Sequence, residues 1–222
     1  MMSPIPHRDV IFVIELQLVK IQRELPLLLK ILEATIQNVY REVEALTREM
    51  RPDPLAGTKI GYMLHVYMEP RIRRAIEEAG IENVVASAVQ NSAGAYHLEI
   101  RTPFAILMFA HVQREGDVPR RANYRQKYVD QTFMREVYPE LELFSSDSIP
   151  LYVITHARSK VSASEAIIRI GRLSVDQESW SCNYDLHSLV ASAVTTEEIV
   201  PQSAIAARED IKRESRIQLK HG

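Results

Sequence analysis

"TPFAILMFAHVQ", residues 102–113, is the stretch that decides how this chain folds. It is a continuous apolar run, as expected for a β-strand that is covered on both of its faces. The residues directly before it, "AYHLEIR" at 95–101, alternate strictly and predict a second strand. Thr102 and Pro103 between the two strands leave their pairing register open, and a slip of one residue would reverse every side chain.

Further strands follow the same pattern on either side of this pair. Residues 83–90, 148–157 and 165–175 are strand-like, and residues 178–190 close the sheet before a short helix. The segment after the apolar run predicts a helix from about Pro119 to Met134. A helix that follows a doubly covered strand normally packs back on the sheet, so we expect this one to do so.

The N-terminal part is helical by its periodicity. Residues 9–50 carry apolar residues three and four apart, and Pro26 predicts a break just before it because proline has no N–H to donate. A second helical tract runs from about residue 54 to 79, interrupted at Gly61 and Pro70, and Gly80 suits the left-handed position that ends a helix. The first tract contains a heptad-like seam made of Leu28, Leu32, Ile36, Val39, Val43, Leu46 and Met50.

This seam needs a partner, and two partners fit. An exposed apolar stripe of that length would be an aggregation liability on a monomer, so we expect a homodimer that self-associates through the seam. The alternative is an antiparallel hairpin within the chain, which the short turn at 51–57 favours. Both arrangements hold if two hairpins form a four-helix bundle.

These elements predict an α+β protein, with long N-terminal helices that form a helical hairpin and a mixed or antiparallel sheet with flanking helices. We divide the chain into a helical region at 1–80, a sheet domain at 81–200 and a charged helix or tail at 201–222.

Composition narrows the class of protein. With 46% hydrophobic and 25% charged residues the chain has the make-up of a folded protein, and a net charge of −2 gives it no bulk attraction to nucleic acid. One cysteine excludes an internal disulfide framework and a cysteine-based zinc cluster. The apolar runs are short and flanked by charge, so we expect no membrane segment and a cytoplasmic protein.

The order helix, strand, strand, strand, helix, strand resembles the core of restriction-endonuclease-like nucleases. In that family an acidic residue on the second strand and an acidic-x-Lys pair on the third hold a divalent metal ion. Here the second strand offers His97 and Glu99, and the third ends in His111 and Gln113. With one carboxylate and no lysine, such a site is degenerate, and we expect no metal and no cofactor.

Two interpretations of His97, Glu99 and His111 stay open. Two histidines and a carboxylate are an acceptable ligand set for zinc, if all three converge on one face. The simpler interpretation is that they form the water-facing side of a hairpin whose inward residues are Tyr96, Leu98 and Ile100.

The basic segment "REGDVPRRANYRQKYVDQ", residues 114–131, is the candidate surface for phosphates. Between residues 114 and 128 it has five cations against two acids, a small excess. We therefore expect nucleic-acid binding, if any, to be weak, and the segment to be mainly a structural helix with Tyr124 or Tyr128 against the strand. The candidate phosphate contacts are Arg120, Arg121, Arg125 and Lys127.

The run at 97–128, together with "YVITHA" at 152–157 and "WSCNYDL" at 180–186, resembles a group of uncharacterised bacterial proteins encoded beside helix-turn-helix regulators. That resemblance covers about residues 95–190. It implies a regulatory, toxin–antitoxin or phage-defence locus and supplies no catalytic residues. We expect a non-catalytic interaction protein with a possible protein partner, and the alternative is a divergent nuclease or nucleic-acid-binding protein.

Overall fold

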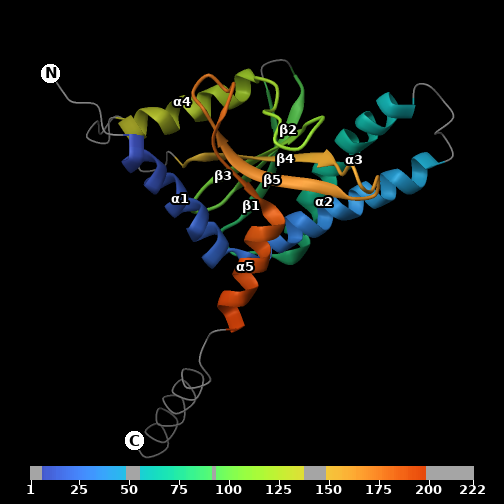
Figure 1. Cartoon of the computed structure of the whole chain (residues 1–222), viewed down its shortest axis with the longest axis horizontal. Coiled ribbons are helices and arrows are strands. Elements are labelled where there is room, and N and C mark those ends of the chain that lie inside the picture. Colours follow the sequence, from blue (N-terminus) through green and yellow to red (C-terminus); the bar gives the residue numbers. More distant parts are fainter. Residues whose placement is uncertain (1–6, 49–55, 92–93, 138–148, 199–222) are drawn as a thin grey trace, which may run out of the picture.

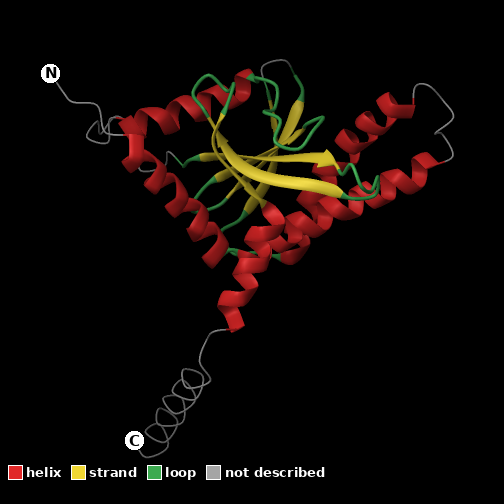
Figure 2. Ribbon diagram, in the orientation of Figure 1, coloured by secondary structure: helices red, strands yellow, loops and turns green. Residues whose placement is uncertain are grey.

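The computed structural model describes residues 7–48, 56–91, 94–137 and 149–198, and it confirms the α+β class (Figures 1 and 2). The strands are β1 (Val85–Gln90), β2 (Tyr96–Arg101), β3 (Ile106–His111), β4 (Leu151–Arg158), β5 (Ala166–Leu173) and β6 (Trp180–Asp185). The helices are α1 (His7–Glu24), α2 (Pro26–Thr47), α3 (Ala56–Ala79), α4 (Asn123–Val137) and α5 (Leu186–Glu198).

The strands form one sheet in the order β1-β2-β3-β4-β5-β6, and every pair is antiparallel except β3 with β4. A parallel pair needs a crossover from one end of the sheet to the other, and α4 lies within the segment that makes it. The predicted order of helix, three strands, helix and strand is confirmed from α3 to β4. The start of α4 is later than predicted, at Asn123.

Each face of the sheet has its own helices, and β3 is buried between them. Its residues Ile106 and Met108 pack in a cluster with Val129, Tyr124 and Tyr128 of α4. The alternate residues of the strand join the larger core formed by the other helices and the opposite face of the sheet. The continuous apolar run is therefore covered on both faces, as its sequence predicts.

Of the helix breaks predicted from the sequence in the N-terminal region, one is confirmed and two are wrong. Pro26 occupies the first turn of α2 and Leu25 separates that helix from α1, so the predicted break is confirmed. In contrast, α3 continues through Gly61 and Pro70, because buried Met68 and Ile72 on either side of the proline hold it in the core. Gly80 ends α3 with a φ of 58°, the left-handed value expected there.

The heptad-like seam of α2 is buried inside the chain. Its first five members are between 0 and 2% exposed, and they share one hydrophobic core with α3 and with the sheet. Leu46 is 56% exposed, and Met50 lies outside the described residues. The intrachain alternative therefore describes this seam, and one core joins the helical region to the sheet.

The seam can be tested with a matched pair of substitutions on one helix. Val43→Glu places a carboxylate in the core, and we expect the free energy of unfolding to fall by about 3 kcal/mol or more. Leu46→Glu, three residues along the same helix on its exposed side, should change it by less than about 0.5 kcal/mol. Urea unfolding followed by circular dichroism measures both. Equal losses in the two variants would contradict this packing.

Candidate functional site

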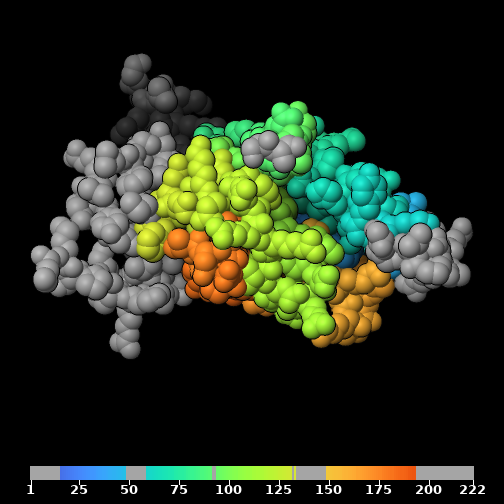
Figure 3. All heavy atoms as spheres, turned by 90° about the horizontal axis from the view of Figure 1, so that it is seen from above, coloured from blue at the N-terminus to red at the C-terminus, as the bar shows by residue number. Residues whose placement is uncertain are grey.

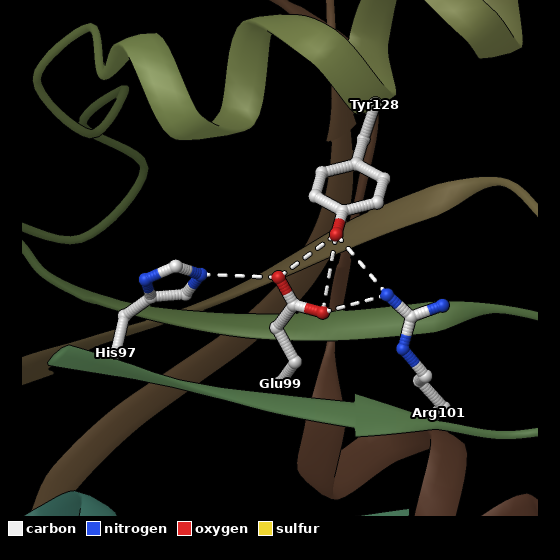
Figure 4. A network of polar contacts seen from close by, with 4 residues as sticks. All are labelled: His97, Glu99, Arg101 and Tyr128. Carbon is white, nitrogen blue, oxygen red and sulfur yellow. Dashed lines mark hydrogen bonds and ion pairs between the residues drawn. The ribbon is translucent and has the colours of Figure 1, made fainter. Parts of the chain in front are cut away.

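Glu99 of β2 is the centre of a closed polar network between the sheet and α4 (Figure 4). Its Oε1 is 3.1 Å from Nε2 of His97 and accepts from the hydroxyl of Tyr128 at 2.9 Å. Its Oε2 accepts from the guanidinium of Arg101 at 3.0 Å. The hydroxyl of Tyr128 also receives a hydrogen bond from Arg101. Both carboxylate oxygens are therefore occupied by the protein itself.

This network contradicts the prediction of a water-facing hairpin side. Glu99 is 1% exposed and His97 is 7% exposed, because α4 lies over this face of the sheet. The inward set is correct for Leu98 and Ile100, which are buried on the opposite face, but Tyr96 at the strand's start is exposed. Burial raises the pKa of Tyr128, and its hydrogen bond to Glu99 adds to that rise.

His111 and Gln113 do not join Glu99. In the register of the sheet Glu99 stands opposite Met108, so His111, three residues along β3, lies on the other face. There its ring is 5.4 Å from the ring of His156 in β4. The predicted zinc set is therefore split between two faces. Within the described residues no group of three or more His, Cys, Asp and Glu side chains is arranged to bind a metal ion.

His156 is buried against α2. Its Nδ1 is 3.0 Å from the hydroxyl of Tyr40, and burial lowers its pKa to about 3, with His111 and His65 as smaller causes. Burial likewise raises the pKa of the Tyr40 hydroxyl. The pKa of His111 is lowered, first by partial burial and then by the positive charge of Arg158. The imidazole of His156 is therefore neutral at physiological pH.

Side chains from both faces of the sheet line a cleft of about 950 Å³. The cleft lies where β3 ends and the loop toward α4 begins. Figure 3 shows this side of the molecule, with α3 in cyan opposite the light-green loop and α4. The walls combine apolar and polar side chains. Among the polar ones, β2, β3 and β4 each contribute a histidine, α3 contributes a histidine and a glutamate, and the loop contributes arginines. The chemically relevant members are His65, Glu69, His97, His111, Gln113, Asp117, Arg120, Arg121, Tyr124, Arg125 and His156.

The loop of residues 112–122 is held in place by the β5–β6 hairpin. The indole N–H of Trp180 donates to the carbonyl of Gly116 at 3.1 Å. The side-chain amide of Gln177 exchanges two hydrogen bonds with the backbone of Ala122, directly before α4. Arg169 of β5 forms an ion pair of 3.2 Å with Glu115. Three anchors along the loop thus fix the cleft wall and the first turn of α4.

Arg125, in the first turn of α4, is 3% exposed and lines the cleft. Its Nη2 donates to the carbonyl of Arg120, whereas its Nε and Nη1 have no hydrogen-bond partner among the residues that the structure describes. Burial lowers the pKa of its guanidinium. Tyr124 beside it stacks on the imidazole of His97, with ring centroids 4.2 Å apart.

His97 connects the cleft to the Glu99 network. Because a carboxylate only accepts hydrogen bonds, the hydrogen bond between them puts the proton on Nε2 of His97. In the neutral ring Nδ1 is then an acceptor, and it has no partner among the described residues. His97 and Arg125 therefore line the same cleft, and His97 brings to it a ring nitrogen without a hydrogen-bond partner among the described residues.

Three of the four predicted basic residues line the cleft, and Lys127 does not. Arg120 and Arg121 are exposed and line the cleft, Arg125 is buried within it, and Lys127 is exposed elsewhere on α4. Sequence reasoning missed Glu69 and the histidines of α3 and β4 as members of the site. His65 and Glu69 stand four residues apart on α3, a spacing that places them on one face of the helix and that sequence reasoning could have noticed. His156 lies far along the chain on β4, so no local pattern connects it to that pair. Burial raises the pKa of Glu69, with His65 opposing that rise.

Comparison with protein-family models, with curated proteins and with solved structures finds no match for this chain. Among the described residues no helix is long and apolar enough to cross a membrane.

The buried His156 predicts a loss of stability in acid. In the unfolded chain it gains a proton near its ordinary pKa of 6.5, whereas the folded protein resists protonation down to about 3. Its contribution to stability is therefore present above pH 6.5 and is lost as the pH falls. Between pH 7 and 5 the loss amounts to about 2 kcal/mol. Urea unfolding at the two pH values measures it.

His156→Gln should remove this part of the pH dependence. His187→Gln is the control, because Glu33 raises the pKa of His187 and its contribution has the opposite sign, present in acid and lost as the pH rises. The acid loss should persist in the His187 variant. An unchanged pH dependence in His156→Gln would contradict the buried neutral imidazole.

Proposed function

We propose that the protein is a non-catalytic binding protein that acts through its sheet domain and the cleft beside it. The observation that carries this proposal is the closed network around Glu99. A catalytic carboxylate or metal ligand needs an oxygen that is free to meet water, substrate or metal. Both oxygens of Glu99 are used by His97, Arg101 and Tyr128.

The surroundings of Glu99 support the same conclusion. The residue opposite it on β3 is Met108, and the next residue on that face is Ala110, so the neighbouring strand offers no second carboxylate and no lysine there. Two-metal or one-metal phosphodiester cleavage depends on such convergent charges. A divergent nuclease stays the runner-up, to be decided by assay.

The setting of this binding protein rests on the sequence resemblance. The bacterial proteins that residues 95–190 resemble are encoded beside helix-turn-helix regulators, and this resemblance favours an interaction protein of a bacterial regulatory, toxin–antitoxin or phage-defence locus, which would act in the cytoplasm. A binding protein with a polar cleft suits such a locus, where one component senses a ligand or holds a protein partner. If a helix-turn-helix regulator is encoded beside this protein, pull-down with that regulator tests this setting. Failure to associate with it would count against the proposal.

The absence of catalysis has a direct test. Purified protein with magnesium or manganese should leave plasmid DNA and RNA intact, because Glu99 has no second carboxylate beside it among the described residues and is already paired with Arg101. Tyr128→Phe opens one position on the carboxylate and should not create cleavage either. Cleavage by the wild-type protein that disappears in Glu99→Gln, with folding verified by circular dichroism, would establish the nuclease instead.

We propose self-association through another surface, because the buried residues of the α2 seam pack within the chain. We propose that a homodimer uses apolar side chains of the helical region that remain exposed. Exposed examples are Leu16, Val19 and Leu27. Light scattering should then give about twice the chain mass of 25.4 kDa. A monomer at micromolar concentration would rule the homodimer out, and Leu27→Glu should convert a dimer to a monomer if this surface is used.

A further inference from the structure

Arg125 is a buried cation that forms no ion pair with the residues that the structure describes. We propose that the cleft binds the phosphate group of a small phosphorylated ligand, and that Arg125 holds that group. This inference names the ligand class of the binding protein proposed above and rests on that proposal.

The unsatisfied guanidinium is the main argument. Arg125 is 3% exposed, and two of its nitrogens have no hydrogen-bond partner among the described residues. The ring of Tyr124, with its centroid 5.6 Å from the guanidinium carbon, lies against the cation but accepts no hydrogen bond from these nitrogens. Unmet N–H groups of a buried cation destabilise a fold, so a native protein that retains them has a use for them. A guanidinium offers several N–H groups in a planar fork that matches the oxygens of a phosphate. An anion in the cleft would supply the missing acceptors.

The side chains near Arg125 in the cleft wall are also positively charged. Arg120 and Arg121 line the cleft and are exposed to solvent, where they can meet an entering anion. The first turn of α4 opens on the cleft and contains no acidic residue. The N–H groups and the dipole at a helix N-terminus favour negative charge, so this end of α4 adds to the attraction of the arginines.

The acids of the cleft do not neutralise this charge. Asp117 accepts a hydrogen bond of 3.0 Å from the backbone N–H of Arg114, which places its carboxylate in the loop turn. Glu69 lies on α3 and forms no hydrogen bond with Arg125, whose one hydrogen-bond acceptor among the described residues is the carbonyl of Arg120. The unused acceptor of His97 suits a hydroxyl group of the ligand or of a singly protonated phosphate.

The geometry favours a small ligand over the backbone of a duplex. Phosphates of a stiff duplex meet cations that project from a surface, whereas Arg125 lies inside the cleft and Lys127 outside it. The volume of about 950 Å³ is at the upper end of the range of about 300–1,000 Å³ typical of small-molecule sites. The cleft can therefore hold a whole phosphorylated metabolite or mononucleotide.

Inorganic pyrophosphate is the first probe. Its binding is measured by isothermal titration calorimetry and by thermal denaturation, with sodium chloride at the same ionic strength as the control. We expect saturable binding and a higher melting temperature with pyrophosphate alone. Arg125→Met should weaken that binding by about 10- to 100-fold, the range for loss of hydrogen bonds to a charged group. Lys127→Met, two residues along the same helix, should bind as the wild type does.

The unliganded variants separate a ligand-binding role from a structural one. Because Arg125→Met removes an unpaired buried charge, it should melt no lower than the wild type without ligand. A lower melting temperature together with unchanged pyrophosphate binding would overturn the proposal. If Arg125→Met does not fold, the exposed pair Arg120→Gln/Arg121→Gln decides. That pair should weaken binding several-fold, and unchanged binding would overturn the proposal.

Two further probes identify the source of the phosphate. A mononucleotide should bind at least as tightly as a short single-stranded oligonucleotide that carries a 5′-phosphate. Much tighter binding of the oligonucleotide, lost with a 5′-hydroxyl end, would assign the cleft to a nucleic-acid terminus and overturn the small-ligand assignment. These experiments measure binding and not cleavage. A lack of phosphate binding would contradict only this inference, whereas nuclease activity would contradict the proposed function.

Discussion

The parallel pairing of β3 with β4 is the constraint on which the rest of the structure depends. Two neighbouring strands that run in the same direction cannot be joined by a tight turn, so the chain must cross over one face of the sheet. The crossover brings α4 onto the face that carries His97 and Glu99. It also sends the loop of residues 112–122 across the end of the sheet, where it forms one wall of the cleft. One topological requirement thus produces both the buried network and the cleft.

Much of the fold could be predicted because its signals are local. The alternation of β2, the continuous apolar run of β3 and the break at Pro26 each follow from a few adjacent residues, and each is confirmed. The pairing partners of the α2 seam could not be predicted in the same way. A heptad pattern states that a helix face is buried, but a second helix of the same chain and a second copy bury it equally well. The short connection to α3 favoured the outcome that the structure has.

The candidate site was harder to predict, and the errors have a physical cause. Alternation along β2 correctly separates two faces, but it does not say which elements cover each face. A polar face is assigned to water by default, and α4 overrides that default by bringing the hydroxyl of Tyr128 to Glu99. The position of His111 depends on register, which the turn at Thr102 and Pro103 left open. The histidines of α3 and β4 become neighbours of the loop only through the tertiary fold.

Two buried charges lie at α4: Glu99 on the strand that the helix covers, and Arg125 on the helix itself. They differ in how far the protein compensates them. Glu99 has a cation and a hydroxyl on its oxygens, so the protein itself compensates its desolvation. Arg125, one turn before Tyr128 on α4, has a single backbone acceptor and two unused nitrogens. Because Glu99 is already paired with Arg101, its charge is not available to Arg125, although His97 touches both environments. Among the described residues, both oxygens of Glu99 have hydrogen-bond partners, whereas two nitrogens of Arg125 have none. Arg125 is the one of the two that lines the cleft.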